Sequence, residues 1–127
     1  MTGKSVFEKM RIKPGRQVLL VNPPANFHEV LGNLPEGVTL QRELKSGMDT
    51  ILCFMTTRAQ MEQQLTKLKG LLADKGSLWI AYPKGTSRLK SELNRDLLAE
   101  FASTVGLKAI FIISMDDTWS GLRMLQN

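Results

Sequence analysis

Four short apolar runs constrain the fold of this chain more than any other feature. They are QVLLV (17–21), DTILCFM (49–55), SLWIAY (77–82) and KAIFIIS (108–114). Runs of this length that lack polar alternation are typical of strands buried within a sheet, and a parallel strand is buried on both faces. Such a sheet needs helices over each face, so the segments between the runs should contain them.

The connecting segments do carry apolar residues at helical spacing. The clearest begins after Thr57, where Gln60 lies three residues on and completes a capping box. Its apolar stripe comprises Met61, Leu65, Leu68, Leu71 and Leu72. Gly76 follows where a helix end is favoured. Further helices are expected over 5–10, 26–34 and 91–105.

Two more strands complete the prediction. Segment 38–43 alternates as a strand does, but the link from it to the strand at 49–55 is too short for an ordinary parallel crossover. Either this strand is short and the link runs across the end of the sheet, or the strand pairs antiparallel. Segment 122–126 follows MDDTWSG, which suits a hairpin with 108–114. The order predicts one α/β domain over residues 1–127, Rossmann-like, with a mostly parallel sheet, helices on both faces and a C-terminal antiparallel hairpin.

Charge and composition limit the function classes. The net charge of +5 favours encounter with anions. The basic residues are dispersed along the chain, however, and aromatic residues make up only 6%. A solvated basic surface is therefore favoured over a nucleic-acid site. No apolar run is long enough to span a bilayer, which argues against a membrane partner.

The single cysteine, Cys53, and the charged N-terminal segment bear on location. One cysteine can form neither an internal disulfide nor a metal cluster, so no metal site is expected. The first 15 residues have no apolar segment typical of a secretory signal. These features predict a cytoplasmic protein.

Three stretches resemble the class I S-adenosylmethionine-dependent methyltransferases: KPGRQVLLVNPP, LKGLLADKGSLWIAYP and EFASTVGLKAIFI. The chain resembles more narrowly a family of small uncharacterised bacterial proteins, through NPP, LWIAYPK, Arg95-Asp96 and DDTWSGL. The first resemblance implies a trimmed methyltransferase-like fold. The second supplies a fold and no established activity.

The end of the first strand departs from the methyltransferase pattern. That family has an acidic residue in the strand and Gly-x-Gly after it, and the glycines let the backbone approach the cofactor. Here Leu20, Asn22 and Pro24 occupy those three positions. The Asn-Pro-Pro of DNA amino-methyltransferases is not matched either, since two residues intervene before Phe27. We therefore expect no cofactor and no active S-adenosylmethionine-dependent methyltransferase.

A ligand, if one binds, is expected at the carboxyl ends of the strands, where open α/β sheets bind theirs. The candidate ligand-binding residues are Asn22, Pro23, Pro24, Thr56, Thr57, Arg58, Tyr82, Lys84, Asp116 and Trp119. A helix N-terminus at Thr57 with Arg58 and Lys84 nearby suits an anion. The alternatives are that Thr57 only caps its helix and that Trp119 belongs to a hairpin. No residue is assigned a catalytic role.

Three function classes follow. The first is a non-catalytic or degenerate methyltransferase-like domain that acts as a binding or interaction module with an unknown protein partner. The second is an enzyme that uses the strand ends to act on an anionic small molecule. The third is a nucleic-acid-associated protein, which charge alone supports and which is the least favoured.

Overall fold

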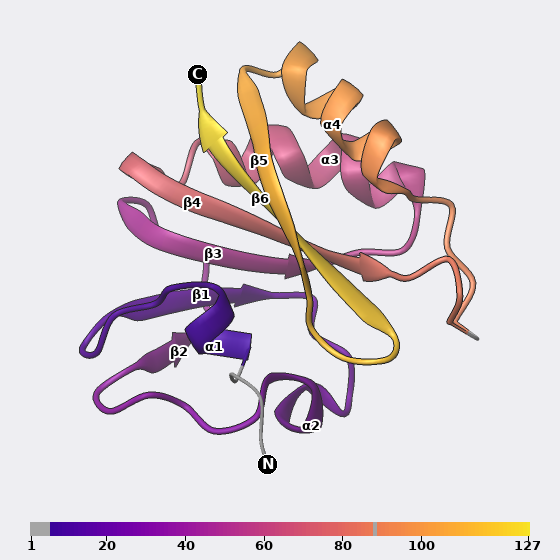
Figure 1. The fold of residues 1–127 in the computed structure, drawn as a ribbon. Coiled ribbons are helices and arrows are strands. Elements are labelled where there is room, and N and C mark those ends of the chain that lie inside the picture. Colours follow the sequence, from indigo (N-terminus) through magenta and orange to yellow (C-terminus); the bar gives the residue numbers. More distant parts are fainter. Residues whose placement is uncertain (1–5, 88) are drawn as a thin grey trace.

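The computed structural model describes residues 6–87 and 89–127, and a six-stranded sheet runs through it (Figure 1). In chain order the elements are α1 (Val6–Lys9), β1 (Gln17–Val21), α2 (Phe27–Leu31), β2 (Thr39–Gln41), β3 (Met48–Phe54), α3 (Arg58–Lys69), β4 (Leu72–Pro83), α4 (Arg95–Thr104), β5 (Leu107–Ser114) and β6 (Trp119–Gln126). Strands and helices alternate over most of the chain, as the apolar runs predict.

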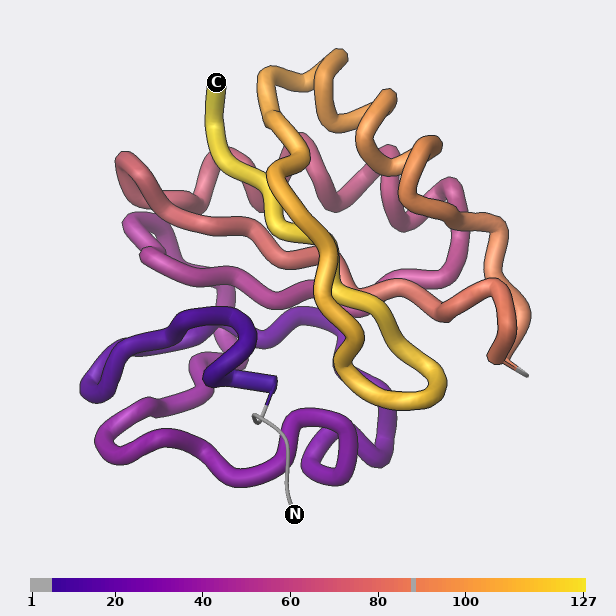
Figure 2. Tube along the Cα trace, in the orientation of Figure 1, coloured from indigo at the N-terminus to yellow at the C-terminus, as the bar shows by residue number. Residues whose placement is uncertain are grey.

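The sheet has the order β2-β1-β3-β4-β6-β5. The first four strands are parallel, and β6 is antiparallel to both β4 and β5. The trace in Figure 2 shows the yellow C-terminal strand, β6, beside β4. Strand β5 lies along the other side of β6 and runs antiparallel to it. The predicted Rossmann-like class and the C-terminal hairpin are thus confirmed.

Helices cover both faces of the sheet, and each face has its own apolar cluster. On one face, Met61, Leu65 and Leu68 of α3 and Leu98 and Ala102 of α4 pack on the strands. On the other face, α1 and α2 contribute their buried residues to a second cluster with Trp79 and Phe54. The two layers of helices therefore account for strands that are apolar on both sides.

Strand β2 shows how segment 38–43 pairs in the sheet. It is only three residues long and runs parallel to β1, with Thr39 opposite Gln17. Because it pairs with the beginning of β1 only, the short link to β3 suffices to cross the end of the sheet. Of the two alternatives, the short parallel strand is the one observed.

The boundary between α3 and β4 differs from the prediction. The helix ends at Lys69, and β4 begins at Leu72, so Leu71 and Leu72 do not belong to the helical stripe. Gly76 lies inside the strand, where a Cβ atom would come within 2.9 Å of the Met48 carbonyl oxygen. This glycine permits close approach of β4 to β3 and does not end a helix.

The helices are also shorter than predicted. Helix α2 has five residues, and Leu34 beyond it is 45% exposed. Helix α4 begins after Asn94, whose Oδ1 accepts a hydrogen bond from the Leu97 amide at 2.8 Å. Leu97 of this helix is half-buried and packs at the margin of the core, and Ile112 of β5 is 38% exposed. The fully buried residue of that helix turn is Leu98.

Candidate functional site at the carboxyl edge of the sheet

The strand order reverses between β1 and β3. The chain leaves β1 for β2 on one side and then returns to β3 on the other side of β1. Ligands of open α/β sheets bind in the crevice beyond the carboxyl ends at such a point. We call this side, where the parallel strands β1, β3 and β4 end, the carboxyl edge.

Asn22 bridges the two strands at this reversal. Its backbone has a φ of 53°, in the left-handed region that asparagine enters more readily than most residues. Its side-chain amide donates a hydrogen bond to the Phe54 carbonyl oxygen at 3.0 Å. The turn after it is set by Pro23 and Pro24, both half-buried, and the Pro24 carbonyl accepts from the Phe27 amide at 3.1 Å. The end of β1 is thus bound to β3 through the Asn22 side chain.

The N-terminus of α3 is satisfied from within the chain. The predicted capping box is confirmed: the Thr57 hydroxyl accepts from the Gln60 amide at 3.1 Å, and the Gln60 side chain accepts from the Thr57 amide at 3.1 Å. The same Gln60 oxygen accepts from the Thr56 amide at 2.7 Å. The Arg58 amide donates to the Glu92 carboxylate at 2.9 Å. A carboxylate of the protein therefore lies where helix N-termini favour an anion.

Sequence reasoning did not identify Glu92 or its neighbour Ser91 as part of this edge. The Ser91 hydroxyl donates to the Thr56 carbonyl at 3.2 Å, and the Glu92 amide donates to the same carbonyl at 2.9 Å. These bonds hold the segment before α4 against the end of β3. No local sequence pattern predicts these hydrogen bonds, because the bonded residues lie more than 30 positions apart in the sequence.

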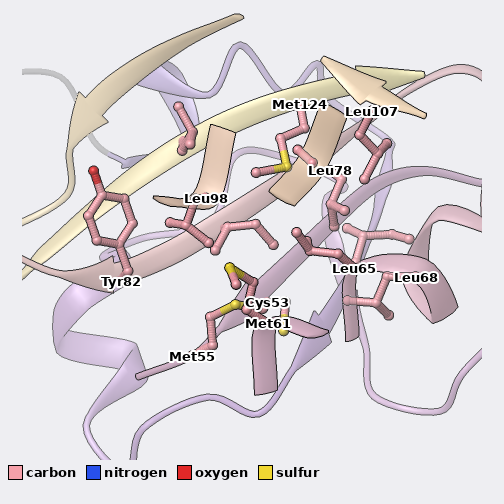
Figure 3. Close-up of a cluster of buried hydrophobic side chains, with 14 of the residues drawn as sticks. Cys53, Met55, Met61, Leu65, Leu68, Leu78, Tyr82, Leu98, Leu107 and Met124 are labelled. Atoms are coloured by element: carbon pink, nitrogen blue, oxygen red, sulfur yellow. The ribbon is translucent and has the colours of Figure 1, made fainter. Parts of the chain in front are cut away.

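Tyr82 and Lys84 lie at the end of β4. Tyr82 is 5% exposed and belongs to the cluster beneath α3 and α4, and Figure 3 shows its hydroxyl directed away from the other labelled side chains. Burial raises the pKa of Tyr82; the charge of Arg95 acts against this, and that of Asp96 adds to it. The Lys84 ammonium donates to the Ser114 hydroxyl at 2.6 Å, which connects the end of β4 to the end of β5.

Asp116 and Trp119 shape the hairpin between β5 and β6. The Asp116 carboxylate accepts from the amides of Thr118 and Trp119 at 2.8 and 2.7 Å, which fixes the turn. Trp119 is 5% exposed, and its ring lies edge-on to Phe54 with centroids 4.9 Å apart. Trp119 therefore belongs to the hairpin and packs against the core.

A surface cavity of about 320 Å³ opens beside the end of β4. Lys84, Ser87, Lys90 and Ser91 are among the residues that line it. A neighbouring cavity of about 300 Å³ shares Ser87 and reaches Asp117 and Thr118 of the hairpin. Hydroxyl groups and two lysines therefore line the first cavity, and Asp117 adds a carboxylate to the second.

Cys53 takes no part in this edge. It is fully buried in β3, and Figure 3 places its sulfur near Met55 and Met61. Burial raises the pKa of the Cys53 thiol to about 12, so the reactive thiolate is scarce at neutral pH. Within residues 6–87 and 89–127, no group of three His, Cys, Asp or Glu side chains is placed to hold a metal ion. None of the described helices is long and apolar enough to cross a membrane.

Comparisons with solved structures identify the fold. A TehB-like S-adenosylmethionine-dependent methyltransferase from Corynebacterium glutamicum matches with a TM-score of 0.60 and 11% identity, over 95% of this chain and 85% of that one. A ribosomal protein L11 methylase from Lactobacillus delbrueckii subsp. bulgaricus matches with a TM-score of 0.61 and 12% identity, over 95% and 74%. An S-adenosylmethionine-dependent methyltransferase from Aquifex aeolicus matches with a TM-score of 0.57 and 16% identity, over 94% and 89%.

No protein-family model and no curated protein matches the chain. At these identities the structural similarity establishes the fold alone, and no match narrows it to one family. The expected methyltransferase-like fold is confirmed, and it extends over nearly the whole chain.

Proposed function

We propose that this chain is a methyltransferase-like domain that acts as a binding or interaction module and does not transfer methyl groups. The observation that carries the proposal is the Asn22 bridge to the Phe54 carbonyl at the strand reversal. Glycines at this position of the fold let the backbone approach a cofactor closely. Asn22 retains the left-handed backbone that glycine adopts freely, but its side chain stands between β1 and β3.

Two further features support the absence of methyl transfer. Pro24 adds a ring and removes an amide donor where the second glycine is expected. Leu20, at the position of the acidic residue, is 1% exposed and packs within the cluster under α1 and α2. Neither residue offers S-adenosylmethionine a hydrogen bond from its side chain.

Calorimetric titration of S-adenosylmethionine into the protein tests this proposal. We expect no binding with a dissociation constant of about 10 μM or tighter, which corresponds to roughly −7 kcal/mol. The matched variant is Asn22→Gly, which keeps the backbone conformation and removes the bridge. Binding by Asn22→Gly alone would identify the amide as the obstruction, whereas binding by the unmodified protein at that affinity would contradict the proposal.

A second candidate function is the binding of, or action on, an anionic small molecule at the carboxyl edge. The cavity lined by Lys84 and Lys90 favours it, since both residues come from the segment that follows β4. The proposed contacts are Asn22, Thr56, Thr57, Tyr82, Lys84 and Trp119, with Pro23, Pro24, Arg58 and Asp116 at the margin. Because the Glu92 carboxylate already bonds the α3 N-terminus, the anion would use the lysine side of the cavity.

Amide chemical-shift mapping during titration of phosphate and nucleotides tests the second candidate. We expect shifts to gather at Lys84, Ser87 and Ser91, and to extend to Asn22 and Thr57 if the ligand spans the strand reversal. A Lys90→Gln variant should weaken binding, with Lys75→Gln, at the opposite end of β4, as control. Shifts confined to the outer surfaces of α3 and α4 would exclude this site.

A further inference from the structure

Four basic residues from three segments of the chain lie along β5. The Lys9 ammonium donates to the Ser114 carbonyl at 2.8 Å, at the end of that strand. The guanidinium carbons of Arg11 and Arg123 lie 5.7 and 5.6 Å from the centre of the Phe111 ring. Lys108 is exposed near the start of β5. We refer to Lys9, Arg11, Lys108 and Arg123 as the β5 basic strip.

The strand register places the strip on one face of the sheet. Phe111 is opposite Arg123, and Lys108 is opposite Leu125, two residues further along β6. Residues directly opposite in an antiparallel pair point to the same side, as do residues two apart on one strand. From Lys108 to Ser114 the strand extends about 20 Å at about 3.3 Å per residue. The charges are therefore spread along the strand, with Arg11 and Arg123 together at Phe111 and with Lys9 and Lys108 toward its two ends.

Arg11 has a backbone conformation that an arginine rarely adopts. It follows α1 with a φ of 60°, its amide bonds to the Glu8 carbonyl, and the next amide bonds to the Phe7 carbonyl. These two bonds make a Schellman cap, in which the left-handed position is usually glycine. A non-glycine residue there is strained, and such strain is a reason to look for a function of the side chain.

None of the four strip residues belongs to the ion pair that the described residues form, which joins Arg16 and Asp49 at the starts of β1 and β3. Arg123 donates through Nε to the Ser77 hydroxyl at 3.0 Å, which uses one of the five N–H groups of a guanidinium. The remaining donors are suited to bidentate contact with a phosphate.

We propose that the β5 basic strip binds a single-stranded nucleic acid. A linear row of cations with an aromatic ring and guanidinium planes fits a flexible polyanion whose phosphates follow the row and whose bases stack on the planes. A stable protein partner would need an apolar anchor at the centre of its interface, and Phe111 at the centre of the strip is already flanked by two cations. The inference is independent of whether S-adenosylmethionine binds at the carboxyl edge.

Fluorescence anisotropy with a labelled oligouridine of about 12 nucleotides tests the inference on the full chain. Counterion release predicts a slope of log affinity against log salt of about −0.7 for each phosphate contacted, so the strip should give about −2 to −3. At about 50 mM salt the same relation predicts that removing one contact weakens binding about eightfold.

Two variants distinguish binding at the β5 basic strip from a general effect of the protein's positive charge. Arg11→Gly removes one cation and places glycine where the cap prefers it, so the protein should unfold at no lower temperature while binding weakens about eightfold. Lys108→Gln should act similarly. The control is Lys67→Gln, an exposed lysine of α3 on the opposite face of the sheet, which should bind as the unmodified protein does.

The inference is overturned if the oligonucleotide does not bind, or if Arg11→Gly and Lys108→Gln bind it as tightly as Lys67→Gln does. Equal competition by a polyglutamate peptide would assign the strip to an acidic protein partner instead. Equal affinity for a duplex of the same length would exclude stacking of unpaired bases as part of recognition.

Discussion

Replacing Trp119 with alanine is expected to lower the free energy of unfolding by about 3 to 5 kcal/mol. The indole is 5% exposed and contacts Phe54 edge-on within the cluster beneath α1 and α2. Removing it deletes buried apolar surface, leaves a cavity and breaks the aromatic pair. Chemical denaturation followed by circular dichroism measures the change.

The control for this prediction is Asp117→Ala, in the same turn but exposed, which should alter the free energy of unfolding by no more than about 0.5 kcal/mol. Trp119→Phe should fall between the two, because it keeps a ring beside Phe54. A loss below about 1 kcal/mol for Trp119→Ala would mean that the indole does not support the core.

Replacing Leu65 with alanine is expected to cost about 2 to 5 kcal/mol of unfolding free energy. Leu65 is fully buried where α3 packs on the sheet, so the substitution leaves a cavity between the two layers. The dependence of the free energy on denaturant should keep its slope, since the fold itself is retained. Leu34→Ala provides the comparison, because Leu34 is 45% exposed and its loss should cost little.

If the Leu65→Ala and Leu34→Ala proteins unfold at the same denaturant concentration, the assignment of the inner face of α3 is wrong. A loss confined to Leu65→Ala would instead support the packing of this face of α3 on the sheet.

The elements that the sequence predicts well are those whose signals are local. The run 17–21 coincides with β1, and the capping box at Thr57 sets the start of α3 within one residue. Periodicity over a short window and one hydrogen-bond pattern at a helix end are sufficient for both. The same applies to the hairpin, where a turn-rich segment separates two strands.

The predictions from the sequence fail where tertiary contacts determine the secondary structure or the burial of a residue. Leu72 fits a helical stripe as well as a strand, and its place in β4 follows from pairing with Met48 of β3, which the local pattern does not contain. Ile112 reads as a core residue, yet it lies on the outermost strand and is 38% exposed. Apolar character alone does not tell a central strand from an edge strand.

The arrangement of the carboxyl edge could be predicted only in part. The strand ends identify Asn22 and Lys84, because the topology brings the ends of parallel strands to one side. The partners of these residues were not predictable, since the bond from Asn22 to Phe54 spans 32 positions and that from Arg58 to Glu92 spans 34. The gathering of cations along β5 was missed for the same reason.

The position of β6 affects how the chain can fold during its synthesis. Translation proceeds from the N-terminus, so β5 leaves the ribosome before β6, yet β5 pairs with β6 and has no place beside β4. Until 119–126 has emerged, any sheet that the growing chain forms in this order ends at β4, and the apolar segment 107–114 lacks its neighbour. A nascent chain in this state exposes an unpaired strand edge, the feature that recruits chaperones and promotes aggregation. The sheet can therefore be completed only after 119–126 has left the ribosome, because β6 lies between β4 and β5.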